Sequence, residues 1–188
     1  KNKINVFNDF RNLNKILKNK LDYSINAISG IDGLDPTLKI IKYTKKIAIA
    51  NKESIICGWN LIHKELKKNH TNFIPIDSEH FSIYELIKNQ NPSLIKKIII
   101  TASGGPFFNR KIKKKITVKD ALNHPNWKMG KKITVDSSTL ANKVFEVIEA
   151  KKIFNLNFKD ISILINQNSY IHAIVLFNNG IIKILVHE

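Results

Sequence analysis

The chain has 188 residues, 43% of them hydrophobic, which is enough for one good core or two small ones. Its 31 Lys and Arg residues against 15 Asp and Glu residues give a formal net charge of +16, which raises the possibility of an anionic partner. The excess is mostly lysine spread along the chain beside abundant Asn and Ile, and no aromatic-interleaved basic motif accompanies it. We therefore predict no nucleic-acid partner.

Cysteine usage and hydropathy restrict the cellular compartment that we expect for the protein. The single cysteine, Cys57, cannot form an internal disulfide, and the longest apolar runs are too short to cross a bilayer. The first residues do not have the pattern of a secretory signal. We therefore expect a reducing compartment and no membrane partner.

The first part of the chain alternates helical and extended patterns. Residues 1–20 carry apolar side chains at three- and four-residue spacing, which predicts an amphipathic helix. The next predicted elements are a strand over 23–30, a helix over 35–46, a strand over 47–50, a helix from 52 to about 68 and a strand over 72–76. Asp35 is the predicted N-cap of the first of these helices, with Pro36 at its first helical position. This rhythm is typical of a parallel sheet with helices on its faces.

The second part of the chain ends differently. Its predicted elements are a strand over 97–101, a short helix near Thr117, a strand over 133–136, a helix over 138–152, and strands over 161–165, 170–177 and 181–186. The last two strands fit a hairpin with Gly180 in the turn. We therefore predict an α/β protein with a boundary near residue 73, between a wound parallel segment and a mixed α/β segment.

Polar clusters follow three of the predicted strands. Asp77 and Glu79 follow one, the segment 103–105 follows another, and Asp136 and Ser137 follow a third. Ligands of open parallel sheets bind outside the carboxyl ends of the strands. We therefore expect these clusters to converge on one ligand site.

The pair of carboxylates in "PIDSEH" has two interpretations. Asp77 and Glu79 are two residues apart, so in extended backbone both side chains point the same way. A third carboxylate from a neighbouring helix would complete an all-oxygen site suited to Mg²⁺ or Mn²⁺. The alternative is a helix N-cap whose acidic residues are favoured by the helix dipole. Taken alone, the pair favours the cap.

The helix predicted over 138–152 carries further polar groups. Its spacing puts Asn142, Glu146 and Glu149 near one face, with Lys143 beside Glu146. An ordinary capped helix with one salt bridge explains the same pattern.

Two loops and one histidine also leave alternatives open. "SGGP" either cradles a phosphate with its backbone N–H groups or forms a plain turn. "HPNWKMG" is either a lid over a ligand or a hydrophobic anchor. His172 lies in an alternating apolar strand, and this pattern favours the role of a core residue over that of a ligand.

Five ordered motifs carry a family resemblance. They are "GLDPTLKIIKYTKKIAIANKES", "PIDSEHFSIYEL", "TASGGPF", "LNHPNWKMGKKITVDSSTLANKVFEVIEA" and "NSYIHAIV". From about residue 24 to residue 180 the chain resembles the 1-deoxy-D-xylulose 5-phosphate reductoisomerase family of the non-mevalonate isoprenoid pathway. The resemblance implies conversion of that phosphorylated sugar to 2-C-methyl-D-erythritol 4-phosphate. It also implies NADPH and a divalent metal, Mg or Mn, as cofactors, and a homodimer for the full-length parent. The compartment that it implies is a bacterial cytoplasm, with a plastid stroma as the alternative.

The resemblance assigns roles residue by residue. The implied metal ligands are Asp77, Glu79 and Glu146. The implied substrate contacts are Lys52, Ser78, Glu79, Ser103, His124, Ser137, Asn142, Lys143 and Glu146. The residues implied in catalysis are Lys52, Glu79, His124, Trp127 and Glu146, where Trp127 belongs to the lid. The implied NADPH contacts are Asn51, Glu53 and Gly130. His172 matches a position near the active site without a fixed role.

The resemblance also implies a domain plan. Residues 1–73 correspond to the C-terminal part of a Rossmann-like NADPH domain with a parallel sheet, and residues 74–188 to a mixed α/β catalytic domain. The chain has no glycine before Gly30, so the glycine-rich pyrophosphate loop is missing, and the family's helical C-terminal domain is absent. We therefore expect an internal fragment of the enzyme. The alternative is a catalytically inactive structural fragment that retains the metal and substrate motifs.

Overall fold

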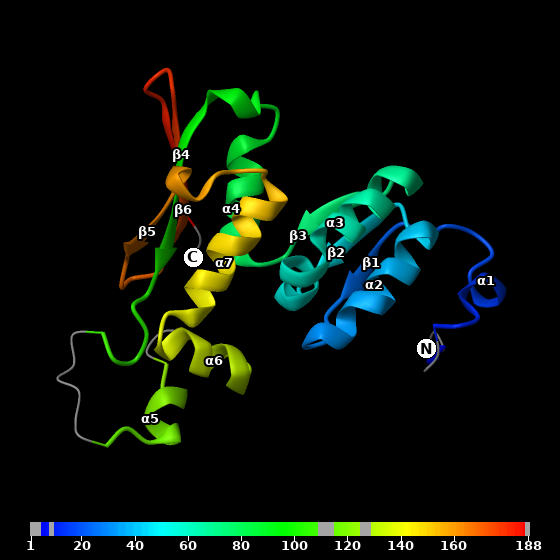
Figure 1. The fold of residues 1–188 in the computed structure, drawn as a ribbon, viewed down its shortest axis with the longest axis horizontal. Helices are drawn as coiled ribbons and strands as arrows, with labels where there is room; N and C mark the ends of the chain where they lie inside the picture. The colour runs from blue at the N-terminus through cyan, green and yellow to red at the C-terminus, as the bar shows by residue number, and fades with distance from the viewer. Residues whose placement is uncertain (1–4, 8–9, 109–114, 125–128, 187–188) are drawn as a thin grey trace. The chain divides into compact units, whose positions relative to one another are not determined.

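The computed structural model describes residues 5–7, 10–108, 115–124 and 129–186. The chain divides into two compact units, Lys1–Ile76 and Asp77–Glu188 (Figure 1). Both combine helices with a sheet, so the predicted α/β class is confirmed. Among the described helices, none is both long and apolar enough to span a bilayer.

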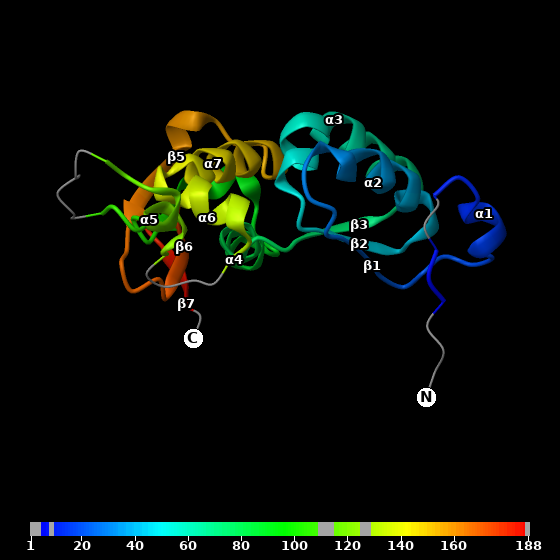
Figure 2. The same ribbon diagram turned by 90° about the horizontal axis from the view of Figure 1, so that it is seen from below.

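The first unit is built on a three-stranded parallel sheet in the order β1-β2-β3. Its elements are α1 (Leu13–Ile16), β1 (Ser24–Asn26), η1 (Ile31–Gly33), α2 (Leu34–Ile40), η2 (Ile41–Tyr43), β2 (Lys46–Ile49), α3 (Lys52–Asn69) and β3 (Asn72–Pro75). Figure 2 shows α2 and α3 on one face of this sheet. The core of the unit forms where Ile47 and Ile49 of β2 and Ile55 and Ile62 of α3 are buried.

The longest helix, α3, begins and ends with specific capping groups. The Asn51 side chain accepts a hydrogen bond from the Ser54 backbone N–H at the start of the helix. His70 ends it in a left-handed conformation, and its N–H reaches the Leu66 carbonyl. The predicted helix from residue 52 to about 68 is therefore confirmed.

The second unit is built on a mixed four-stranded sheet in the order β5-β4-β6-β7. Its elements are α4 (Ser78–Ile87), η3 (Pro92–Leu94), β4 (Ile95–Ala102), α5 (Val118–Leu122), α6 (Lys131–Ser138), α7 (Ala141–Ile153), η4 (Phe158–Asp160), β5 (Ile161–Ile165), β6 (Ile171–Phe177) and β7 (Ile182–Val186). β4 and β5 run parallel, whereas β6 pairs antiparallel with both β4 and β7. The core joins Ile83 of α4 and Ala150 of α7 to Ile98 and Ile100 of β4 and Val175 of β6.

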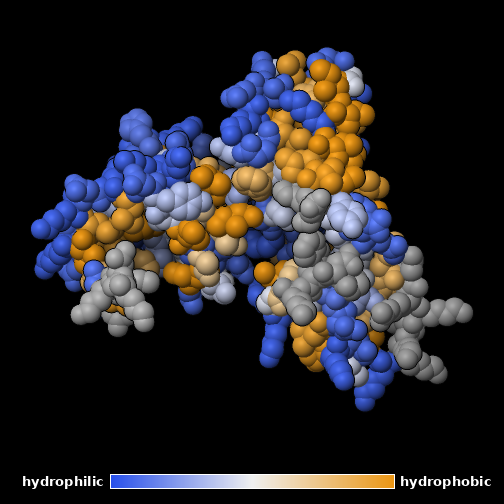
Figure 3. Space-filling view, turned by 180° about the vertical axis from the view of Figure 1, so that it is seen from behind, coloured by the Kyte–Doolittle hydropathy of each residue, from blue (hydrophilic) through white to orange (hydrophobic). Residues whose placement is uncertain are grey.

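The opposite face of this sheet carries exposed apolar side chains. Ile182 and Ile184 on β7 and Leu164 on β5 are all exposed. The strand register places these three residues on the side away from Ile98 and Ile100, which face the helices. Figure 3 shows hydrophobic side chains gathered on the second unit in the view from behind.

Three sequence predictions about local structure are wrong. The segment 133–136 is not a strand but lies within the helix α6, so Asp136 and Ser137 do not follow a strand. Of the predicted N-terminal helix over 1–20, only α1 is helical among the described residues, and none of its side chains is buried. A short amphipathic helix without a partner for its apolar face is marginal in water, which explains the difference.

The third wrong prediction concerns the start of α2. Gly33, not Asp35, occupies the N-cap position, because the 3₁₀ turn of η1 runs directly into the helix. Asp35 instead pairs with Lys39 one turn later, at 2.6 Å.

Candidate metal and substrate site

Asp77 and Glu79 stand at the beginning of α4. Asp77 occupies the N-cap position, yet its side chain makes no capping hydrogen bond, and Glu79 lies in the first helical turn. The expectation that extended backbone aligns the two carboxylates is therefore wrong, because Glu79 is helical. The helix start itself turns both carboxylates toward the same neighbour, α7.

The third carboxylate, Glu146, comes from the middle of α7. Its side chain is buried, with a relative exposure of only 1% for the residue. One oxygen each of Asp77, Glu79 and Glu146 can be chosen so that all three lie within 4.8 Å of one another. The amide of Asn142, one turn earlier on α7, donates a hydrogen bond to Glu146 Oε1. Three carboxylates gathered in this way are a donor set suited to a hard divalent cation.

The ammonium group of Lys143 lies between two of these carboxylates. Lys143 Nζ is 2.7 Å from Glu79 Oε1, and it also forms an ion pair with Glu146 Oε2. Burial by itself lowers the pKa of Lys143, but the carboxylates of Glu146 and Glu79 raise it above the usual value. The Lys143 ammonium therefore supplies positive charge that balances part of the negative charge of the carboxylates.

Glu79 has two further neighbours. Ser78 Oγ donates a hydrogen bond of 2.6 Å to Glu79 Oε2, and His172 Nδ1 lies 3.8 Å from the same oxygen. Burial and the negative charge of Asp77 raise the pKa of Glu79, but the His172 ring and the Lys143 ammonium lower it more, so the net shift is downward. Glu79 is thereby held as a carboxylate, the form that a metal ion requires.

A second polar group lies around the loop after β4. Ser103 Oγ is 3.2 Å from His124 Nε2, and burial lowers the pKa of His124. Gly105 has a φ of +72°, and a Cβ added there would come within 2.6 Å of the Ser137 carbonyl oxygen. The glycine-rich loop therefore packs directly against the C-terminal end of α6, where Ser137 lies.

The remaining predicted site residues belong to the first unit, to the start of α6 or to the part of the chain that the structure does not describe. Lys52, Glu53 and Asn51 belong to the first unit, where Asn51 also donates hydrogen bonds to the backbone carbonyls of Ile28 and Gly30. Gly130 is the exposed N-cap residue of α6. Trp127, and most of the predicted lid with it, lies outside the described residues.

Sequence reasoning missed one group in this region. His80 is fully buried on α4, and its two ring nitrogens face Asp77 and the backbone of Glu146. Its spacing of three residues from Asp77 on a helix start is a signal that could have revealed the first of these contacts.

The fold and the site define an α/β protein with a partly buried carboxylate cluster of the kind that holds a divalent cation. Two family models match the chain: 1-deoxy-D-xylulose 5-phosphate reductoisomerase over residues 1–58, and the C-terminal domain of the same enzyme over residues 73–154. The chain belongs to the 1-deoxy-D-xylulose 5-phosphate reductoisomerase family.

Individual relatives agree with the family models. The chain is 66% identical to the 1-deoxy-D-xylulose 5-phosphate reductoisomerase of Pelagibacter ubique, over 99% of this chain and 49% of that protein. It is 47% identical to the enzyme of the same name from a Wolbachia strain of Culex pipiens, over 85% of this chain and 41% of that protein. The chain thus spans about half the length of the curated relatives it matches.

Solved structures of the same enzyme resemble this fold. A reductoisomerase crystallised with NADPH, fosmidomycin and magnesium superimposes with a TM-score of 0.81 at 38% identity, over 88% of this chain and 43% of that one. The enzyme of Zymomonas mobilis in complex with NADPH gives a TM-score of 0.80 at 34% identity, over 89% of this chain and 43% of that one.

Proposed function

We propose that this chain is part of an enzyme that converts 1-deoxy-D-xylulose 5-phosphate to 2-C-methyl-D-erythritol 4-phosphate with NADPH and a divalent metal, Mg or Mn. The carboxylate cluster of Asp77, Glu79 and Glu146 is the observation that carries the proposal. Family membership supplies the reaction, and the cluster supplies a place where its metal-dependent step can occur.

The cluster fits a divalent cation in charge as well as in geometry. Its three carboxylates carry more negative charge than the single ammonium of Lys143 balances. A divalent ion held there would polarise the carbonyl and hydroxyl oxygens of the substrate for the rearrangement. Glu79 and Glu146 would be its ligands together with Asp77, and Ser78, on the exposed start of α4, would redirect its hydroxyl hydrogen bond from Glu79 to the substrate.

The phosphate end of the substrate would bind to groups near the glycine-rich loop. Ser103, His124 and Ser137 offer a hydroxyl or ring donor each, and the Ser103–His124 contact already joins two of them. Asn142 and Lys143 complete the proposed set from α7. Lys143 would have to leave its two carboxylate partners when a metal ion binds, which would make its charge available to the phosphate.

The NADPH site and the lid complete the proposal. Residues 1–73 would contribute part of the NADPH domain through Asn51 and Glu53, with Gly130 at the start of α6 as a further contact. Lys52, at the first position of α3, would contact the substrate. Trp127 would close over the substrate and exclude water. Family membership and the parallel sheet of the first unit support this assignment.

Oxidation of NADPH tests the function directly. The complete protein is expected to consume NADPH only when deoxyxylulose phosphate and Mn²⁺ are both present, measured as loss of NADPH absorbance. No turnover under these conditions would contradict the proposal. The same assay on the 188-residue chain alone decides the alternative, an inactive fragment, which robust turnover by that chain would exclude.

We also propose that the complete protein is a homodimer and that the exposed sheet face takes part in the contact. Ile182, Ile184 and Leu164 form an apolar surface of the kind that protein interfaces bury. Ile184→Lys is expected to raise the dimer dissociation constant about tenfold or more, because it places a charge in this surface. Sedimentation velocity measures the change. Leu61→Lys, at an exposed apolar position of α3, is the matched control, and equal dimerisation of both variants would argue against this face.

A further inference from the structure

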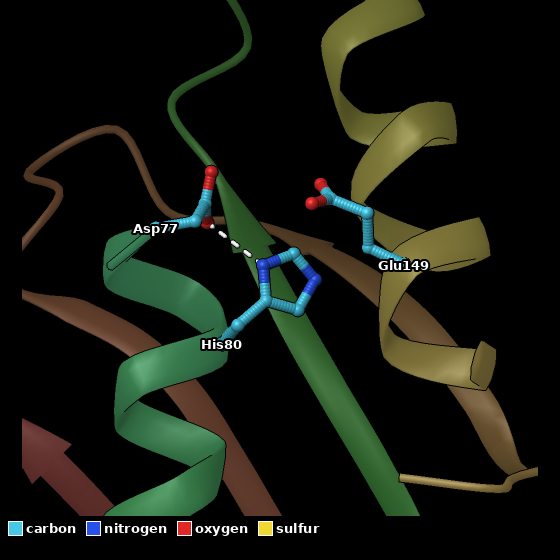
Figure 4. Close-up of side chains that lie close together, drawn as sticks. All are labelled: Asp77, His80 and Glu149. Atoms are coloured by element: carbon cyan, nitrogen blue, oxygen red, sulfur yellow. Dashed lines mark ion pairs between the residues drawn. The ribbon is translucent and has the colours of Figure 1, made fainter. Parts of the chain in front are cut away.

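A buried histidine, His80, is in contact with two residues of the carboxylate cluster. Figure 4 shows the ring of His80 on α4 between the carboxylates of Asp77 and Glu149, with Glu149 projecting from α7. His80 Nδ1 is 3.1 Å from Asp77 Oδ1, and His80 Nε2 is 2.9 Å from the Glu146 backbone oxygen. His80 and Glu149 have relative exposures of 0% and 2%. The ring therefore touches the side chain of one proposed metal ligand and the backbone of another.

The two contacts define how the ring is held. A backbone carbonyl only accepts hydrogen bonds, so Nε2 must donate to Glu146 O. The opposite nitrogen, Nδ1, then faces Asp77 Oδ1 at hydrogen-bond distance. Burial lowers the pKa of His80, but Asp77, Glu149 and the carbonyl of Glu146 raise it more, to about 9. A carboxylate oxygen also only accepts, so these two contacts together require a proton on each ring nitrogen.

We propose that His80 is a positioning residue for the metal site: it holds the Asp77 carboxylate in its ligand orientation through the ion pair between Nδ1 and Asp77 Oδ1, while its second nitrogen anchors the ring to the backbone of α7 at Glu146. The inference rests on the proposed metal-binding function of the cluster. It adds a role for His80, which contacts neither substrate nor metal, and for Glu149, whose carboxylate keeps the ring in place from the other side.

The location of Asp77 explains why such a support is needed. Asp77 precedes the first turn of α4, where the backbone is not held by the full hydrogen-bond pattern of a helix. Its side chain makes no capping hydrogen bond to the helix. A rigid ring that spans from α4 to α7 ties this carboxylate to the helix that bears Glu146. Groups that orient metal ligands in this way commonly change metal affinity 10- to 100-fold when they are replaced.

Two substitutions at His80 separate the contact of Nδ1 with Asp77 from the hydrogen bond of Nε2 to Glu146. The amide of Asn overlays Nδ1 of histidine, so His80→Asn retains a donor toward Asp77. The amide of Gln overlays Nε2, so His80→Gln retains only the contact with Glu146. In the complete protein we expect His80→Gln to weaken Mn²⁺ binding about tenfold or more, and His80→Asn to recover most of that loss. Electron paramagnetic resonance of free Mn²⁺ measures the dissociation constants, and thermal unfolding in chelator measures stability separately.

Ile83→Val, one turn further along α4 and equally buried, is the control for a purely structural effect. A structural role alone predicts that Mn²⁺ affinity follows thermal stability across all three variants, and that result would overturn the inference. Binding of two Mn²⁺ ions per chain, with the second lost in both His80 variants, would also overturn it, because His80 would then be a ligand. Should neither His80 variant fold, Glu149→Gln decides: a loss of affinity of about threefold or more supports the inference, and unchanged affinity overturns it.

The same Mn²⁺ titration distinguishes failure of the proposed metal-binding function from failure of the inference about His80. If the unaltered protein does not bind Mn²⁺ at all, the proposed metal site itself is wrong. If it binds Mn²⁺ and His80→Gln binds equally well, only the role of His80 is wrong.

Discussion

Glu146→Gln is expected to lower the affinity of the complete protein for Mn²⁺ by about 100-fold or more and to abolish metal-dependent turnover. Glu146 is almost fully buried, so water does not easily take over the place of its charged oxygen. The amide of Gln has nearly the same shape, but it offers a single neutral oxygen. Loss of one negative charge in a buried site removes much of the attraction for a divalent ion.

The measurement is a Mn²⁺ titration followed by electron paramagnetic resonance, with circular dichroism to verify the fold. Asp136→Asn is the matched control, because Asp136 lies on the neighbouring helix α6 and pairs with Lys132 at 3.1 Å. Removing that carboxylate should leave Mn²⁺ affinity unchanged. Equal affinity of the Glu146→Gln variant and the unaltered protein would exclude Glu146 as a ligand.

Lys143→Met is expected to change stability and metal affinity in opposite directions. Without metal, the substitution leaves Glu79 and Glu146 without the buried ammonium that bridges them, which should cost about 3–5 kcal/mol of unfolding free energy. With metal, the same substitution removes a competing cation from the cluster. Mn²⁺ should therefore bind more tightly than to the unaltered protein, and it should restore much of the lost stability.

Urea unfolding in chelator and in excess Mn²⁺ measures the two effects on one sample. Lys132→Met is the control, because its partner Asp136 lies in a solvent-exposed pair whose loss should cost no more than about 1 kcal/mol in either condition. A fall in both stability and Mn²⁺ affinity on Lys143→Met would show that the lysine supports the metal site and does not compete with the ion.

The sequence predicted most of the elements because their local signals agreed with their packing. The apolar run of β2 forms a buried strand and the pattern from residue 52 forms the long helix α3, as predicted, and the structure adds the N-cap at Asn51. The hairpin of β6 and β7 was equally clear, since Gly180 adopts a φ of +86° in its turn. The predictions that failed depend on context. Residues 133–136 alternate like a strand, but in the structure they belong to the helix α6. The buried residues of this helix, Thr134 and Ser138, are four residues apart, which is the spacing of a helix face.

For the site, the sequence alone determined which residue types are present and that Asp77 and Glu79 come just after a strand. Taken alone, this pair favoured a helix cap over a metal site, and it was the family resemblance that predicted Asp77, Glu79 and Glu146 as metal ligands. Only the tertiary structure decided that Glu146 approaches both carboxylates and that Lys143 and His80 contact the cluster. The physical reason is that α4 and α7 are far apart in sequence and meet only by packing on the same sheet, so no local pattern encodes the distance between their side chains.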